Sequence, residues 1–508
     1  MVRQITFLEA LNMPAPTMDI GPYITDAFSA DGYCPEDERQ ALERKYAPIL
    51  EVTDKFDRRS VSYQLSKNDA LHSWLKYKEA FSAELVDILL DEMGAVPGDL
   101  VMDPFMGSGT TALACQMRGI NSVGFDILPL SAVSIMAKAN VMRYDAAEIA
   151  RVIRDFRALK MPDDYAGRTP YITITDTAYP EFNERFIQFA TDWMAASAYS
   201  ALAKNLFTLC MVNALEGCSY TAKSGQYLSW DSRSKKVIEA NVQRAKAGRR
   251  LLPEHRCREV VGNIQEAVTV ELSRALSDIE AIQAGGAGDS GATIDFRQRS
   301  ALFELPRMEG DSLRGVITSP PYCNRYDYTR TYALELVYLG LGEAEIKRMR
   351  QALLSCTVEN KPKIEAIRDS YAETGARDRF EYIHGAIEAN AAFREVRQAL
   401  SLRKAHGDLN NNGVIRMVEG YFTELAFIFA ELYRICKKGA TVAFINDNVR
   451  YGGEIIPVDF LSTSFAEQFG FTAKRVYCLR QQKGNSSQQM KKYGRAALRK
   501  SITIWAKE

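Results

Sequence analysis

The sequence has little histidine and no paired cysteines, and both scarcities limit the kinds of site it can hold. Its 508 residues include 4 histidines and 9 cysteines. The cysteines form no C-x-x-C pair and have no histidine partner at metal-ligand spacing, so we expect no zinc site and no other metal centre. Odd, scattered thiols are typical of a reducing compartment, which indicates a cytoplasmic protein.

Three further features are missing. The chain has no long uncharged apolar stretch and no basic-then-apolar leader, so we expect no membrane association. It also has no excess of either charge, because 64 lysines and arginines balance 64 aspartates and glutamates. Any surface for nucleic acid must therefore be local. With 46% hydrophobic residues, the chain can nevertheless bury a large core.

The most informative segment is a short apolar strand, predicted at 315–318, that ends in Ser319, Pro320, Pro321 and Tyr322. The two prolines prevent the backbone from continuing a ladder or starting a helix, so a rigid lip follows the strand. The serine oxygen and the carbonyl of Pro320 can accept both hydrogens of an exocyclic amine, while the tyrosine ring stacks on the heterocycle. The alternative is a tight turn at the edge of a sheet.

A second motif lies between a predicted strand at 100–102 and a predicted helix at 112–117. Strand, glycine loop and helix form the arrangement by which a parallel α/β sheet receives a nucleotide-like ligand. Gly107 and Gly109 allow the backbone to approach that ligand closely. The loop lacks the spacing of a phosphate-binding loop, so we expect a ligand whose amino and carboxylate groups meet Asp103 and the loop amides.

A second strand, predicted at 122–126, ends in Asp126, about 20 residues after the glycines, where such folds grip ribose hydroxyls. The alternative is a carboxylate that only caps a helix. Further predicted elements are a strand at 293–297, an apolar helix at 421–436, a strand at 440–445, and an antiparallel pair at 471–478 and 501–506. Alternating strands and helices of this kind predict an α/β fold.

Taken together, these motifs resemble the amino-methyltransferases of DNA, which methylate the exocyclic nitrogen of cytosine or adenine with S-adenosylmethionine. The resemblance covers about 70–140 and 290–340, and extends more weakly over 415–508. It implies an α/β, Rossmann-like class I methyltransferase fold. Such a fold has a mostly parallel seven-stranded sheet with an antiparallel last strand, here with a largely helical insertion.

The resemblance also implies a set of cofactor-binding residues. Ser82 is expected to cap a helix at 83–90, and this segment resembles the one that closes over the methionine end of the cofactor. Ser300 stands where the family usually has an acidic residue beside the adenine amine. The implied set is Phe81, Ser82, Asp103, Pro104, Phe105, Met106, Gly107, Gly109, Thr110, Thr111, Asp126, Ile127 and Ser300.

For the catalytic lip, the Thr-Ser-Pro-Pro-Tyr form resembles that of cytosine-N4 enzymes, whereas adenine enzymes more often have Asp in place of Ser319. The implied activity is methyl transfer to N4 of a flipped cytosine, within a restriction–modification or related defence system that includes a cognate endonuclease. Methylation at carbon five is not expected, because the chain has no Pro-Cys-Gln. Three alternatives remain open: an adenine-N6 enzyme, an RNA methyltransferase, and a binding module that has lost the reaction.

Local basic clusters predict contacts with double-stranded DNA. Residues 231–258 contain nine basic residues against three acidic ones, and 471–500 contain nine basic residues and none that is acidic. The alternative for each single lysine is a solvated helix face. The predicted DNA contacts are Arg325, Tyr326, Tyr328 and Arg330 beside the lip, then Tyr227, Trp230, Arg233, Lys235, Lys236, Arg249, Arg250, Lys483, Lys491 and Lys492.

The predicted domain organisation alternates core and insertion. We expect an N-terminal arm at 1–65, loosely structured with one helix, followed by the cofactor-binding core at 66–145. An inserted DNA-recognition region, with a possible β-hairpin at 171–179, takes up 146–290. The catalytic core, a helical insertion and the C-terminal core follow at 291–340, 341–414 and 415–508.

Overall fold

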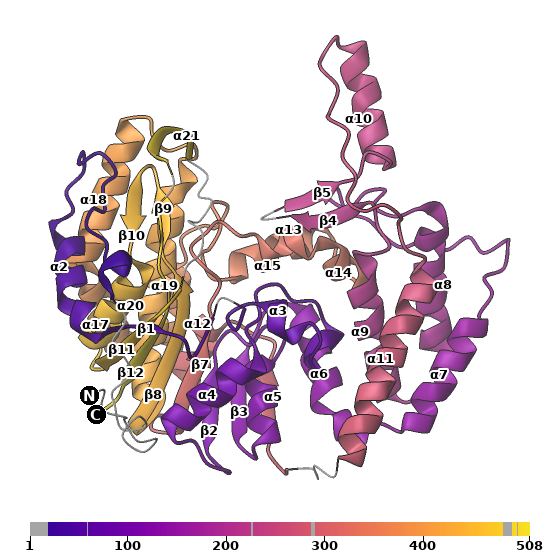
Figure 1. Ribbon diagram of the computed structural model, residues 1–508, viewed down its shortest axis with the longest axis horizontal. Coiled ribbons are helices and arrows are strands. Elements are labelled where there is room, and N and C mark those ends of the chain that lie inside the picture. Colours follow the sequence, from indigo (N-terminus) through magenta and orange to yellow (C-terminus); the bar gives the residue numbers. More distant parts are fainter. Residues whose placement is uncertain (1–18, 58, 225–226, 286–289, 481–489, 495) are drawn as a thin grey trace, which may run out of the picture.

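The computed structural model describes residues 19–508, apart from 58, 225–226, 286–289, 481–489 and 495 (Figure 1). Its centre is an eight-stranded sheet in the order β6-β3-β2-β7-β8-β12-β11-β1. The strands from β6 to β8 run parallel, β12 is antiparallel to both neighbours, and β1 is parallel to β11. The strands are β1 (Leu50–Thr53), β2 (Leu100–Asp103), β3 (Asn121–Phe125), β6 (Ile294–Arg297), β7 (Leu313–Thr318), β8 (Cys436–Asp447), β11 (Thr472–Leu479) and β12 (Lys500–Ala506). The predicted α/β architecture with a mostly parallel sheet and an antiparallel last strand is confirmed.

The predicted number of seven strands is wrong, because the N-terminal region contributes an eighth. β1 pairs with β11 at the edge of the sheet, and α2 (Asp37–Tyr46) precedes it. Arg39 of α2 is fully buried, and its guanidinium lies 2.9 Å from Glu395 and 3.0 Å from Glu454. Since a buried charge is tolerated only when it is paired, the described part of this region belongs to the packed body of the protein and is no loose arm.

Successive side chains of the central strands point to opposite faces of the sheet. Val101 and Ile317 pack against α4 (Ala83–Met93), which covers one face together with α5 (Thr110–Met117). Met102, which follows Val101, and Val316, which precedes Ile317, point to the other face. They pack in the core that contains α19 (Gly413–Ile435) and α20 (Val458–Gln468). The strands are therefore buried on both sides, as expected for a parallel sheet.

The described residues of 146–290 contribute to a second hydrophobic core beside the sheet, where the sequence predicted a largely helical insertion (Figure 1). This core joins α6 of the sheet region with four helices of the insertion and with α14. The elements are α6 (Pro129–Ala139), α7 (Ala146–Ala158), α8 (Glu181–Ala196), α9 (Ala201–Leu215), β4 (Thr221–Ser224), β5 (Tyr227–Trp230), α10 (Lys235–Lys246), α11 (Ile264–Ala284) and α14 (Ala333–Tyr338).

The β-hairpin predicted at 171–179 is wrong. The Thr175 hydroxyl accepts a hydrogen bond from the Ile172 backbone N–H at 3.0 Å, and the Thr175 N–H donates to the Ile172 carbonyl at 2.9 Å. A threonine whose side chain binds a nearby backbone group competes with the hydrogen bonds between strands, and here a turn forms in place of the hairpin. The hairpin of this region is formed by β4 and β5 instead.

The remaining elements are short or belong to the second insertion. Residues 341–414 are helical, as predicted, and several of their helices pack on the α19 side of the sheet. These elements are α3 (Tyr63–Ser66), α12 (Ala301–Glu304), α13 (Tyr328–Thr331), α15 (Glu343–Ala352), α16 (Ile364–Glu373), α17 (Arg377–Ala389), α18 (Ala391–Ala405), β9 (Val449–Tyr451), β10 (Glu454–Ile456) and α21 (Met490–Tyr493). Among the described residues, none of the helices combines the length and the apolar character needed to cross a membrane.

The order of the strands reverses between β2 and β7. From β2 the chain continues to β3 and β6 on one side of the sheet, whereas β7 leads to β8 on the other side. β2 and β7 are paired neighbours, with Met102 opposite Val316. In open α/β sheets, ligands bind at the carboxyl ends of the strands at such a switch point. The segments that follow β2 and β7 meet at this place.

Candidate active site

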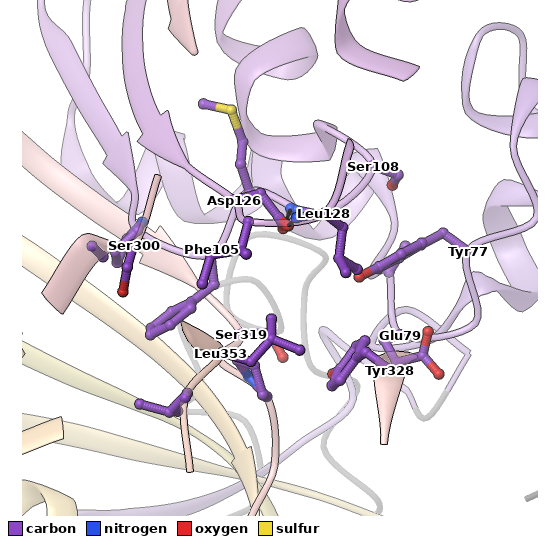
Figure 2. A pocket seen from close by; sticks show the side chains of 18 of the residues that line it. Tyr77, Glu79, Phe105, Ser108, Asp126, Leu128, Ser300, Ser319, Tyr328 and Leu353 are labelled. Atoms are coloured by element: carbon purple, nitrogen blue, oxygen red, sulfur yellow. Dashed lines mark hydrogen bonds between the residues drawn. The ribbon is translucent and has the colours of Figure 1, made fainter. Parts of the chain in front are cut away.

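A cavity lies at the switch point, between the loop after β2 and the lip after β7 (Figure 2). The space between its walls amounts to about 790 Å³, with the solvent at its mouth included. The predicted site residues that line it are Phe81, Pro104, Phe105, Met106, Gly107, Thr110, Asp126, Ile127, Ser300, Ser319, Pro321 and Tyr328. The structure thus brings the two predicted motifs to one cavity, although Gly107 and Ser319 are 212 positions apart in the chain.

The loop after β2 is shaped by backbone hydrogen bonds to the neighbouring strand. The Met106 N–H donates to the Phe125 carbonyl at 2.8 Å, and the Gly109 N–H donates to the Met106 carbonyl at 2.8 Å. Gly109 has a φ of 89°, and a Cβ at this position would lie 2.7 Å from Cγ1 of Ile135. Only glycine fits such a conformation in such a space. The loop then passes directly into α5.

Lys138 of α6 supports the same loop from behind. Its side chain is fully buried, and its ammonium group donates to the Ser108 carbonyl at 3.2 Å. The Ser134 hydroxyl donates to the same carbonyl at 3.2 Å. Burial lowers the pKa of Lys138 to about 7. The loop is therefore held on both sides before any ligand binds.

Asp103, which the sequence predicted to meet the ligand, lies behind the cavity and joins the two motifs. Its carboxylate accepts hydrogen bonds from the Thr318 hydroxyl at 2.7 Å, the Thr111 hydroxyl at 3.1 Å and the Phe105 N–H at 3.0 Å. Asp103 is 1% exposed, and burial raises its pKa to about 6. Asp103 is not one of the described residues that line the cavity. Its position indicates that it fixes the cofactor loop relative to the lip.

Asp126 ends β3 and faces the cavity (Figure 2). One carboxylate oxygen accepts from the Gly107 N–H at 2.8 Å and the other from the Leu128 N–H at 2.9 Å. Each oxygen retains a second lone pair that can accept a hydroxyl hydrogen. Burial raises the pKa of Asp126. This arrangement suits a pair of ribose hydroxyls.

The slot next to Asp126 is apolar. Phe105 and Leu353 lie near Ser300 at this end of the cavity (Figure 2). Ala301 and Leu302, which follow Ser300, complete the wall. A planar heterocycle fits between such side chains, and Ser300 offers one hydroxyl to its edge.

The opposite end of the cavity is formed by the segment before α4. Glu79 and Tyr328 lie close together there (Figure 2). The Tyr332 hydroxyl donates to the Glu79 carboxylate at 2.6 Å, and burial raises the pKa of Glu79. Phe81 lines the cavity two residues later, whereas Ser82 caps α4 by accepting a hydrogen bond from the Leu85 N–H at 3.3 Å. A half-buried carboxylate at this end favours a cationic guest.

The lip is preorganised by its own side chains. The Ser319 hydroxyl donates to the Tyr322 hydroxyl at 3.0 Å, so both lone pairs of the serine oxygen remain available as acceptors. The Lys500 ammonium lies 3.5 Å from the Tyr322 oxygen and 5.0 Å from the centre of its ring. It also pairs with Asp447 at 3.3 Å. Burial raises the pKa of Tyr322, so this residue is a neutral phenol at neutral pH.

The predicted DNA contacts beside the lip have different surroundings. Tyr326 and Tyr328 pack edge to face, with their ring centres 4.9 Å apart. Arg325 has a φ of 70° and donates to Asn410 at 3.4 Å. Arg330 pairs with Asp327 at 3.3 Å and with Glu359, which also binds Arg350. The Arg330 guanidinium is thus part of an ion-pair network.

The predicted contacts in 227–258 divide in the same way. Arg233 binds the buried Asp231 at 2.7 Å and 2.8 Å, and Lys236 lies 4.5 Å from the centre of the Trp230 ring. Lys235, Arg249 and Arg250 are exposed. Near the C-terminus, Lys492 pairs with Asp408. Lys483 and the side chains of Tyr227 and Lys491 lie outside the described residues.

Several residues of the cavity wall escaped sequence reasoning. Tyr77, Glu79 and Ala80 directly precede Phe81, and this closeness is a usable signal. Leu353 and Leu354 come from the second insertion, and Glu424 and Ile428 come from the apolar helix α19, where no local pattern marks a site. The other residues missed are Ser108, Leu128, Arg299, Ala301 and Leu302.

The chain is similar to known proteins over nearly its whole length. A family model for a DNA methylase, of the N6 and N4 type, matches residues 34–132. The type II methyltransferase M.BsoBI of Geobacillus stearothermophilus is 47% identical over 485 residues, which are 96% of this chain and 95% of that protein. The type II methyltransferase M.AvaI of Nostoc sp. is 35% identical over 475 residues, which are 92% of this chain and 93% of that protein. The type II methyltransferase M.MjaII of Methanocaldococcus jannaschii is 28% identical over 151 residues, 30% of this chain and 27% of that protein.

Proposed function

Because the chain belongs to the DNA methylases of the N6 and N4 type, together with type II methyltransferases of similar length, we propose that it methylates N4 of cytosine in double-stranded DNA. The methyl donor in this proposal is S-adenosylmethionine, held in a class I methyltransferase fold. The proposal extends to a role in restriction–modification, in which a cognate endonuclease cuts unmethylated sites.

One observation carries the proposal. The glycine loop and the lip line the same cavity, and the Thr318 hydroxyl joins their two strands through Asp103 at 2.7 Å. A ligand bound on the loop and a base resting on the lip can therefore come into contact. Positioning of this kind is a large part of the rate enhancement in two-substrate reactions.

The residues of the cavity fit S-adenosylmethionine. Asp126 suits the ribose hydroxyls, the slot at Phe105 and Leu353 suits the adenine ring, and Glu79 suits the ammonium group of the methionine half. The loop around Gly107 lines the same cavity. When bound, the cofactor supplies an electrophilic methyl group attached to a sulfonium sulfur.

The lip makes the amine of the base reactive. The lone pair of cytosine N4 is delocalised into the ring, so the nitrogen is a poor nucleophile. Ser319 donates its own hydrogen to Tyr322 and can accept one amine hydrogen, and the Pro320 carbonyl can accept the other. Two acceptors favour a pyramidal nitrogen whose lone pair is localised. The surplus proton can leave to solvent afterwards, so the lip needs no strong base.

Base flipping follows from the depth of the site. An enzyme cannot reach N4 from within a stacked duplex, so the target nucleotide must leave the helix. Tyr328, which lines the cavity, and Tyr322 at the lip provide aromatic faces for the extruded ring. The Thr-Ser-Pro-Pro-Tyr sequence favours cytosine over adenine. Adenine-N6 methylation is the competing function, because the matched family covers both reactions.

The test is to map the modified bases of a genome that expresses the chain. We expect N4-methylcytosine within one recurring sequence, and its absence when Ser319→Ala replaces the wild type. N6-methyladenine in a recurring sequence would establish the competing function. A host genome without any new modified base would overturn the proposal. Oligonucleotides that lack either cytosine or adenine provide the same separation in vitro.

A further inference from the structure

The helix α10 stands apart from the body of the molecule (Figure 1). We call α10 and its return segment, 247–256, the α10 arm. Among the residues of this helix, Val237 in the first turn is the buried one. Ile238 is 52% exposed and Val242 is 47% exposed, and side chains four residues apart share one face of a helix. The arm therefore offers an apolar edge to solvent.

The base of the arm is held by hydrogen bonds, although the rest of the arm projects away from the body of the molecule. The buried Asp231 binds the Arg233 guanidinium and accepts from the Cys257 N–H at 3.1 Å. The Ser234 hydroxyl caps the helix by accepting from the Val237 N–H at 3.3 Å. The Ser232 N–H donates to the carbonyl of His255 at 2.8 Å, which ties the return segment to the start of the arm. The direction of the helix is thus set by its base.

The charge of the arm is strongly positive. Its basic residues are Lys235, Lys236, Arg244, Lys246, Arg249, Arg250 and Arg256, against Glu239 and Glu254. At the tip, Arg249 and Arg250 are exposed, and within the described part of the chain neither guanidinium pairs with a carboxylate. Such cations are available for phosphate groups.

The arm projects on the side where the lip opens. β9 directly follows the carboxyl end of β8, so the β9–β10 hairpin marks the side of the strand ends. In Figure 1 this hairpin and α10 rise on the same side of the molecule, one from each half, with α13 and α15 between them. A duplex that delivers a base to the lip approaches from this side.

We propose that α10 enters the major groove of the substrate duplex, where Ile238 and Val242 contact base edges while Arg249 and Arg250 bind phosphates. The inference rests on the proposed function, because it takes DNA as the substrate. A twelve-residue helix is about 18 Å long, and the groove is about 12 Å wide and admits one α-helix. Apolar side chains in this groove recognise thymine methyl groups, and the cations at the tip hold the register.

The first experiment measures duplex binding without catalysis. Binding of a 30-base-pair duplex to wild type and to Arg249→Ala/Arg250→Ala is followed by fluorescence anisotropy at several salt concentrations. Each lost phosphate contact lowers the slope of log K against log salt by about 0.9, so we expect the slope to fall by about 2. The control is Arg151→Ala/Arg154→Ala, which removes two exposed arginines of α7. An unchanged slope in the arm variant overturns the proposal.

The second experiment tests base reading by the apolar edge. For Ile238→Ser/Val242→Ser, kcat/KM is measured on the mapped site and on duplexes that each differ by one base pair. Since a mismatched base pair weakens specific complexes when the protein reads that pair directly, we expect discrimination at two or more positions to fall about tenfold. Val270→Ser, at a 58% exposed position of α11, is the control. Unchanged discrimination overturns the proposal.

Two readouts separate the possible failures. The substituted arm side chains are exposed, so the thermal midpoint and cofactor binding of each variant should equal those of the wild type. If sedimentation shows a wild-type dimer that Ile238→Ser/Val242→Ser dissociates, the edge is a contact between two copies and the groove proposal is overturned. If the wild type binds duplex through the arm but methylates no DNA, the proposed function fails and the arm inference stands.

Discussion

The carboxylates of Asp103 and Asp126 are each held by two or more hydrogen bonds from the protein, whereas the guanidinium groups of Arg249 and Arg250 stand in solvent at the tip of the α10 arm. Asp126 lines the cavity and Asp103 lies behind it, where the groups around a reacting atom must be positioned before the reaction begins. Arg249 and Arg250 belong to the surface that we propose for DNA, where cations must be accessible in order to exchange counterions for phosphates. Polar groups held by hydrogen bonds are thus typical of the proposed reaction site, and exposed cations are typical of the proposed DNA-binding surface.

Arg330 shows why this distinction matters. It lies close to the lip and was predicted to hold a phosphate, as Arg249 was. Its guanidinium, however, pairs with Asp327, whose side chain is 7% exposed, and with Glu359. An arginine that is paired with carboxylates of the protein stabilises the fold and is not available for a phosphate. The comparison between cavity and arm leads to four predictions.

The largest effect is expected at the lip. Replacing Ser319 by alanine removes one acceptor for the amine of the base and leaves the cofactor loop intact. Loss of one preorganised hydrogen-bonding group costs about 10²–10³ in turnover at comparable sites, so kcat should fall by about that factor. Single-turnover methyl transfer measures this loss, and titration with cofactor should give an unchanged Kd.

Ser300→Ala is the matched control for this prediction, because it removes another serine hydroxyl from the same cavity. It should weaken cofactor binding by a small factor and leave the methyl-transfer step nearly unchanged. A variant at Ser319 with wild-type turnover would remove the lip from the mechanism.

The second prediction concerns pH and Asp103. Burial raises the folded-state pKa of Asp103 from 3.8 to about 6. The folded protein therefore binds this proton more tightly than the unfolded chain does, and the resulting stability is full below pH 3.8 and lost as the pH rises through 6. Asp103→Asn has no such dependence. The difference in unfolding free energy between wild type and variant should fall by at most about 3 kcal/mol across this window.

Denaturant unfolding at a series of pH values measures that difference. Asp99→Asn, which changes a carboxylate just outside β2 whose side chain is 20% exposed, is the control. A difference between wild type and Asp103→Asn that is independent of pH would show that folding does not change the pKa of Asp103.

The third prediction compares the two arginines directly. Within the described part of the chain, Arg330→Ala leaves Arg350 as the one ion-pair partner of Asp327 and Glu359, so the unfolding free energy should fall by about 1 kcal/mol. The salt dependence of duplex binding should not change, in contrast to the Arg249→Ala/Arg250→Ala variant. If Arg330→Ala lowers the slope of log K against log salt while the unfolding free energy is unchanged, Arg330 leaves its carboxylate partners to bind phosphate in the complex. Arg330 would then act like Arg249 and Arg250, against the prediction.

The sequence was most informative where local backbone geometry decides the structure. Strand, glycine loop and Pro-Pro lip are short motifs whose conformations depend on Gly109 and the prolines themselves, and they lie at the cavity as predicted. β1 was missed because a four-residue strand with a glutamate in it gives little signal, and its partner β11 is more than 400 residues away in the chain.

Contacts over such distances also limited the prediction of the site. Leu353 and Ile428 reach the cavity from an insertion and from a core helix, and nothing in their own neighbourhood marks them. The partners of Asp103 and Arg330 likewise could not be read from sequence. Residue type indicated a carboxylate near a ligand and an arginine near a phosphate. The actual roles depend on which groups the fold places around them.

The smallest effect is expected for Lys500→Met. The Lys500 ammonium lies over the Tyr322 ring and beside its hydroxyl, so it holds the ring in place for the flipped base. A cation over an aromatic ring contributes about 0.5–1 kcal/mol, which corresponds to a loss in kcat of about two- to fivefold. Lys507→Met is a closely matched control, since Lys507 lies 4.9 Å from the centre of the Tyr433 ring, away from the lip. Equal kinetics in the two variants would show that the lip positions Tyr322 without help from Lys500. A loss confined to Lys500→Met would show that β12 also contributes to the position of the ring.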